Sequence, residues 1–199
     1  SAANALLKFL EEPQSNITAF LLTDKIHALL PTIRSRCQQI SLSAIPYAIL
    51  KQKLIEEGIS DSMAATVSRL TNEVEEALIL ANDEQFGLTR KSVLKLVQAV
   101  EKDSQEALLC LHEHFGPLLK EKEEAGQVLD LLLFAYRDIV AIKATPETAC
   151  TYPDMIPVWK QLALQTTHGK LSKQVELIVQ AKQDLHKNMN RTRMMEQLM

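Results

Sequence analysis

Over most of its length, the chain places apolar residues three and four positions apart, the spacing that gathers them on one face of an α-helix. Beyond residue 43, the first stretch with this spacing, residues 47–57, ends at Gly58, and glycine commonly terminates helices. Ser60 opens a second short helix and Asn72 caps a third, because both residue types favour the N-cap position. Three short helices with tight connections predict a small bundle over residues 44–86.

Longer helices are predicted over residues 87–199, and one of them, Gln127–Ala144, is apolar on nearly every side. A helix without a polar face is covered by its neighbours, so this one is predicted to lie at the centre of a second bundle. A long irregular connection with three prolines, residues 145–157, follows it. The other predicted helices are Ser92–Asp103, Ser104–Phe115, a segment through Trp159, and Leu171–Asn188.

The first 43 residues have a different pattern. Residues 2–12 predict a helix that ends at a proline, whose ring cannot continue it. Residues 17–23 form a short, nearly continuous apolar run, which is typical of a buried parallel strand. A helical turn over 29–34 and an alternating segment over 39–43, which predicts a second strand, follow.

Two strands cannot make a stable sheet of this kind, because parallel strands need neighbours at their edges and helices on both faces. Residues 1–43 are therefore predicted to be the end of a larger α/β domain whose beginning is absent, and the first residue, Ser1, is not a methionine. The predicted fold class is mainly α, with a C-terminal remnant of an α/β domain, a three-helix domain and an all-α bundle.

Composition excludes several classes of function. The five glycines stand at least ten positions apart, whereas a loop that cradles phosphate needs clustered glycines, so no P-loop or dinucleotide-binding turn is present. The net charge of −3 is not the basic footprint of an autonomous nucleic-acid-binding protein.

Three cysteines, Cys37, Cys110 and Cys150, are far apart and have no companion at metal-ligand spacing, so neither a disulfide framework nor a metal site is predicted. The most apolar stretch, residues 128–142, is broken by charged residues, which excludes a membrane-spanning helix. We therefore expect a soluble, cytoplasmic protein without a membrane partner.

Two groups of residues could carry chemistry. Cys37 with His27 could form a nucleophile pair, but no third orienting group can be named, and a small buried cysteine at the start of a strand is the favoured interpretation. Arg34 and Arg36 come after a short helix and before a predicted strand. Alternate arginines are usually surface charges, although an arginine held at a domain edge can stabilise the charge that develops in phosphoryl transfer.

Three runs of sequence resemble the second half of the AAA+ domain of bacterial clamp-loader subunits of DNA polymerase III. They are NALLKFLEEP at residues 4–13, FLLT at residues 20–23 and LPTIRSRCQ at residues 30–38. The resemblance extends in outline over the whole chain. It implies the end of the AAA+ α/β domain over residues 1–43, a three-helix lid over 44–86 and a helical collar, which joins subunits, over 87–199.

The resemblance also implies roles for individual residues. Ser35, Arg36 and Cys37 match the family's serine-arginine-cysteine motif, in which the arginine reaches in trans, as an arginine finger, to the nucleotide of the adjacent subunit. Thr23 falls at the sensor-1 position, where we expect a vestigial role. No cofactor is expected in this chain itself, and the ATP concerned is bound by a neighbouring subunit.

One departure from the family's motor subunits indicates a subunit that does not hydrolyse ATP. Motor subunits carry a lid arginine that senses nucleotide, whereas the matching position here is Glu75, whose carboxylate would repel a polyphosphate. The ending, residues 186–190 with Glu196, also resembles that of the non-hydrolysing subunits. The chain is therefore not expected to hold a complete active site.

The resemblance implies the gamma or tau motor subunits and the delta subunit as partners and, through the assembled complex, the sliding clamp and primed DNA. Three alternatives stay open at this point. The chain could be a gamma or tau ATPase motor subunit, a helical protein-interaction scaffold without ATP chemistry, or a cysteine hydrolase.

Overall fold

A computed structural model describes residues 9–10, 17–102, 104–116, 118–119, 121–185, 191–196 and 198. The chain divides into two compact units, Ser1–Ala44 and Ile45–Met199, and each is described here by itself.

The first unit contains two short helices, η1 (Ile26–Ala28) and α2 (Pro31–Arg34). The helical turn predicted over residues 29–34 is thus confirmed in α2. Phe9 and Leu10 are helical, and the rest of the helix predicted over residues 2–12 lies outside the described residues.

The two strands predicted in the first unit are absent from its described residues, so that prediction was wrong. Residues 17–23 and 39–43 make no strand hydrogen bonds there, and their apolar side chains are largely exposed, with Leu22 at 91% and Leu42 at 87%. A strand exists only through hydrogen bonds to a neighbouring strand. Within the described residues these segments have neither a paired strand nor a covering helix, so apolar pattern alone does not produce a sheet.

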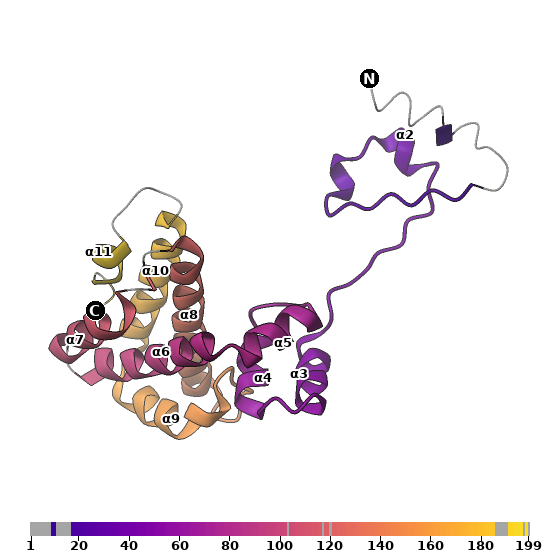
Figure 1. Ribbon diagram of the computed structural model, residues 1–199. Helices are drawn as coiled ribbons and strands as arrows, with labels where there is room; N and C mark the ends of the chain where they lie inside the picture. Colours follow the sequence, from indigo (N-terminus) through magenta and orange to yellow (C-terminus); the bar gives the residue numbers. More distant parts are fainter. Residues whose placement is uncertain are drawn as a thin grey trace. The chain divides into compact units, whose positions relative to one another are not determined.

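The second unit begins with the three short helices that the sequence predicts (Figure 1). They are α3 (Tyr47–Glu56), α4 (Asp61–Val67) and α5 (Val74–Asn82). The helix end predicted at Gly58 is confirmed, because this residue has a φ of 87° and the Ile59 N–H donates to the Leu54 carbonyl at 3.0 Å. The cap predicted at Asn72 was wrong, since Glu73 occupies the N-cap of α5.

The longer helices follow. They are α6 (Glu84–Lys102), α7 (Ser104–Phe115), α8 (Lys122–Ala144), η2 (Pro153–Met155), α9 (Ile156–Gln165), α10 (His168–Asp184) and α11 (Arg191–Glu196). Three of them, α6, α8 and α10, begin earlier than predicted. The helix predicted from Ser92 starts at Glu84 and runs through Gly87 without interruption. The helix predicted from Gln127 starts at Lys122, because Glu123 and Glu124 suit the positive end of a helix dipole.

Helix α8 is the centre of the second bundle, as its all-round apolar pattern predicts. It packs against α6, α9 and α10 (Figure 1). Its buried residues lie on several sides of the helix. Trp159 in α9 and Tyr152 in the preceding connection are fully buried and meet edge to face, with ring centroids 6.4 Å apart.

The predicted division of the second unit at residues 86 and 87 falls inside α6, which spans it as one helix. Helices also pack across that division: α5 contacts α6, and α4 contacts η2. The separate lid over 44–86 and collar over 87–199 therefore stay predictions. None of the described helices is long and apolar enough to cross a membrane.

Candidate functional site

The residues that the sequence singles out lie around α2 in the first unit. Pro31 occupies the first turn of this helix, where its fixed φ is pre-organised and its missing N–H costs nothing. Ile33 is the buried side chain of α2 and holds the helix in the unit. The helix ends after one turn at Ser35, the C-cap residue.

Ser35 and Arg36 both fold back onto the end of α2. The Ser35 hydroxyl donates to the Thr32 carbonyl oxygen at 3.1 Å, and Arg36 Nη1 donates to the same oxygen at 3.0 Å. Carbonyls at a helix C-terminus carry partial negative charge and have no partner within the helix, so they attract a guanidinium. The Arg36 side chain is exposed, which places a permanently charged, planar donor at the surface of the first unit.

Cys37 and Thr23 line the same pocket, together with Arg34. Cys37 is a half-buried free thiol and follows α2, so the prediction of a buried cysteine at the start of a strand was wrong in both respects. The Thr23 hydroxyl is exposed and accepts from the Lys25 N–H at 3.0 Å. Arg36 lines a second pocket, which Cys37 also lines.

The structure does not bring a nucleophile pair together. No hydrogen bond joins Cys37 to His27 within the described part of the chain, and His27 does not line either pocket. Among these residues there is also no group of three histidine, cysteine, aspartate or glutamate side chains that could hold a metal ion.

Arg34 differs from Arg36 in its surroundings. Its side chain is half-buried, and its Nε is fully buried without a hydrogen-bond partner among the described residues. Two arginines that only the family motif distinguishes in the sequence thus differ in exposure, and the exposed one is Arg36, the arginine of the motif.

Glu75, the residue at the predicted nucleotide-sensing position of the lid, lies exposed in the first turn of α5. Glu76 stands beside it in the same turn and hydrogen-bonds to the Thr71 hydroxyl. Acidic side chains are stabilised at the positive end of a helix by about 0.3–1 kcal/mol, so this turn favours carboxylates. It presents negative charge to anything that approaches it.

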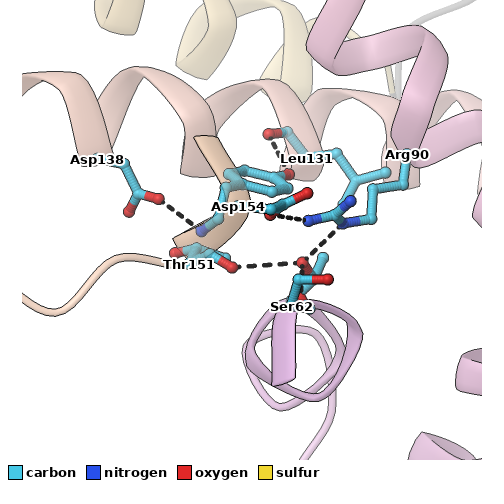
Figure 2. A network of polar contacts seen from close by, with 8 residues as sticks. Ser62, Arg90, Leu131, Asp138, Thr151 and Asp154 are labelled. Atoms are coloured by element: carbon cyan, nitrogen blue, oxygen red, sulfur yellow. Dashed lines mark hydrogen bonds and ion pairs between the residues drawn. The ribbon is translucent and has the colours of Figure 1, made fainter. Parts of the chain in front are cut away.

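Sequence reasoning missed a buried polar cluster around Arg90 in the second unit (Figure 2). Arg90 is only 6% exposed and lies on the apolar face of α6. The signal that could have revealed it is its spacing, because Arg90 stands four residues after Phe86 and three before Val93, both buried.

Two family models match the chain. Residues 1–46 match the family described as "DNA polymerase III, delta subunit". Residues 84–199, more than half of the chain, match the family described as "DNA polymerase III, delta subunit, C terminal". The runs at residues 20–23 and 30–38 fall inside the first match, and the structure describes both of them. Most of the run at residues 4–13 and all of residues 186–190 lie outside the described residues.

Three curated relatives are similar to the chain. The DNA polymerase III subunit delta' of Bacillus subtilis (strain 168) is 36% identical over 198 residues, which is 100% of this chain and 60% of that protein. The subunit tau of the same organism is 25% identical over 202 residues, 87% of this chain and 33% of that protein. The subunit delta' of Pseudomonas aeruginosa PAO1 is 37% identical over 70 residues, 35% of this chain and 21% of that protein. The chain thus spans 60% of the length of the Bacillus delta' relative.

Proposed function

The chain belongs to the DNA polymerase III delta-subunit family, and from this membership we propose that it acts as a delta-prime-type subunit of the clamp loader. In this role it does not hydrolyse ATP itself. It belongs to the assembly that opens the sliding clamp and places it on primed DNA during replication.

The observation that carries the proposal is the exposed Arg36 at the end of α2. A guanidinium is always charged and presents a planar set of donors, which suits the phosphate oxygens of a nucleotide. In our proposal Arg36 is an arginine finger that reaches the ATP bound by a neighbouring subunit and stabilises the charge of the transition state. Ser35 holds the end of α2 through Thr32, and the half-buried Cys37 directly follows Arg36.

Thr23 has no phosphate-binding role in this proposal. Its exposed hydroxyl accepts a hydrogen bond from the local Lys25 N–H, as in an ordinary serine or threonine turn. The acidic first turn of α5 supports the same view, because Glu75 and Glu76 would repel a nucleotide held there. We therefore assign the bound ATP to the neighbour and not to this chain.

The partners proposed are the gamma or tau motor subunits and the delta subunit. The match of residues 84–199 to the C-terminal family model supports this assignment. In our proposal the C-terminal helices, which form a bundle around a buried core, serve as the collar that joins the subunits. Through the assembled complex, the chain would act on the sliding clamp and on primed DNA.

The test is a reconstituted clamp loader that contains Arg36→Ala. We expect the complex to assemble normally and its DNA-stimulated ATPase rate to fall by about tenfold or more, because arginine fingers act mainly on the chemical step. Lys25→Ala is the matched control, since it removes another exposed cation of the same unit. Unchanged ATPase and clamp loading with Arg36→Ala would remove the finger assignment, although family membership would stand.

A second candidate, the ATP-hydrolysing motor subunit, is favoured by the 25% identity to tau over 87% of the chain. Titration calorimetry with ATP discriminates the two, because a motor subunit binds nucleotide itself. Tight ATP binding by the intact protein would replace the delta-prime proposal with the motor proposal.

A further inference from the structure

Arg90 lies where the second unit joins its short helices to its long ones. It belongs to α6, which packs against α5 at one end and against α8 further along. A charged group this deeply buried is costly unless every donor finds a partner. The partners of Arg90 therefore indicate what the residue does.

The guanidinium contacts two segments that are distant in sequence (Figure 2). Its Nε donates to the Thr66 hydroxyl in α4 at 3.0 Å, and its Nη2 donates to Asp154 Oδ1 in η2 at 2.5 Å. Its central carbon also lies 5.1 Å from the centroid of the Tyr152 ring, a cation–π distance. One side chain of α6 thus holds both α4 and the segment before α9.

The Thr66 hydroxyl extends this connection. It accepts from Arg90, and its single hydrogen faces two carbonyl oxygens, that of Ser62 at 2.9 Å and that of Thr151 at 3.3 Å. The contact with Ser62 stays inside α4, whereas the contact with Thr151 reaches the segment before η2. Arg90 orients the hydroxyl so that it can donate in these directions.

The segment that Arg90 contacts, residues 151–154, is itself hydrogen-bonded to α8. The Tyr152 N–H donates to Asp138 Oδ2 at 2.8 Å, and the Tyr152 hydroxyl donates to the Leu131 carbonyl at 2.8 Å. Both acceptors belong to α8, the central helix. A continuous set of buried polar contacts therefore runs from α4 through Arg90 and Tyr152 to α8 (Figure 2).

We propose that Arg90 locks α4 onto residues 151–154, so that the short helices α3–α5 and the long helices around α8 move as one body. Without this lock, α4 would be held mainly by its packing against α3 and α5. Arg90 belongs to the continuous helix α6, which packs against both groups of helices. Its planar guanidinium hydrogen-bonds to Thr66 and Asp154 at the same time. A lysine does not reproduce this arrangement, because its three donors all lie on one nitrogen, whereas Arg90 uses two separate nitrogens, Nε and Nη2. The inference does not depend on the proposed function.

The test is amide hydrogen exchange, followed by mass spectrometry, in the full chain with Arg90→Met, Arg90→Lys or Asp154→Asn. If Arg90 is a lock, amides of residues 61–67 and 150–155 should exchange about tenfold faster in Arg90→Met, because they open without the rest of the fold. Amides in the centre of α8 should change by less than about twofold. Asp154→Asn, at a partly exposed position, should give the same pattern with a smaller change.

Lys91→Met is the matched control, since it removes the neighbouring cation of the same helix from an exposed position. Its exchange pattern should equal that of the parent chain. Equal acceleration in every helix of Arg90→Met would mean that Arg90 only stabilises the core and would overturn the proposal. Unchanged exchange in residues 61–67, or full protection in Arg90→Lys, would overturn it as well.

Discussion

Lys170 Nζ lies 3.0 Å from Glu101 Oε2, so the last turn of α6 is joined to the first turn of α10 across 69 residues of sequence. The Glu101 side chain is only 2% exposed and also accepts from the Thr166 hydroxyl at 3.0 Å. The Tyr136 hydroxyl stands 3.5 Å from its other oxygen. One buried carboxylate therefore gathers donors from α8, α10 and the connection after α9.

Removal of this carboxylate should destabilise the second unit. Glu101→Ala leaves the Thr166 hydroxyl and the Lys170 ammonium without their acceptor, so we expect the free energy of unfolding to fall by about 2–3 kcal/mol. Urea denaturation followed by circular dichroism measures this change. Glu113→Ala, at an exposed position of α7, is the control and should change stability by less than about 0.5 kcal/mol. Equal effects of the two variants would contradict the assignment.

Tyr152 allows a single hydrogen bond to be tested in the core. Tyr152→Phe keeps the buried ring and removes the hydroxyl that donates to the Leu131 carbonyl at 2.8 Å. We expect a loss of about 1 kcal/mol in unfolding free energy. Tyr136→Phe should cost less, because its hydrogen bond to Glu101 is 3.5 Å long. A larger loss for Tyr136→Phe in the same urea titration would contradict this ranking of the two hydrogen bonds, and no loss for Tyr152→Phe would show that its hydroxyl is unimportant.

Asp138 should give stability a pH dependence. Burial raises the pKa of Asp138 above its ordinary value of 3.8, and hydrogen bonds from Thr151 and Tyr152 oppose this rise only in part. Between 3.8 and the raised pKa, the folded state binds more protons than the unfolded state. The contribution of Asp138 to stability is therefore fully present below 3.8 and decreases as the pH rises through this window.

The variant Asp138→Asn removes this titration and keeps an oxygen that can accept from the Tyr152 N–H. Unfolding free energies from about pH 4 to about pH 7 should thus decrease less steeply with pH in the variant than in the parent chain. Glu113→Gln serves as the control for an exposed carboxylate. Parallel curves for Asp138→Asn and the parent would contradict the raised pKa.

Two glycines, Gly58 and Gly169, distinguish the effect of backbone conformation from the effect of the room available for an added Cβ. An added Cβ would meet nothing within 4 Å at either Gly58 or Gly169, but only Gly58 has a positive φ, of 87°. Gly58→Ala should lower the free energy of unfolding by about 1 kcal/mol, because L-residues with a side chain are strained at positive φ. Gly169→Ala, in the first turn of α10, should raise it by about 0.5–1 kcal/mol. Thermal denaturation of both variants checks the signs, and a stabilising Gly58→Ala would refute the argument.

The helical part of the fold was predictable because its signals are local. Apolar spacing placed α3, α7 and α8 in the correct parts of the chain, and Gly58 ended α3 as expected. Boundaries were less predictable. A helix was expected only from Ser92, but α6 begins at Glu84 and includes Gly87, because a glycine in a helix costs only about 1 kcal/mol and the packing of α6 against α5 and α8 outweighs this cost.

The candidate site was predictable only as a set of residue identities. The motif at residues 35–37 named Arg36, but the exposure of Arg36 and the burial of Arg34 Nε depend on how α2 sits on its unit. The two strands expected nearby failed for a related reason, since an apolar run becomes a strand only when a partner supplies hydrogen bonds.

By itself, the sequence determined the mainly helical class, the approximate helices and the motif around Arg36, because each depends on residues a few positions apart. Only the tertiary structure decided that Arg90 is buried between α4 and η2, that Glu101 meets Lys170 and that α6 runs unbroken past Gly87. These features pair groups that lie up to 69 residues apart, and no local pattern specifies which distant partner will satisfy a buried charge.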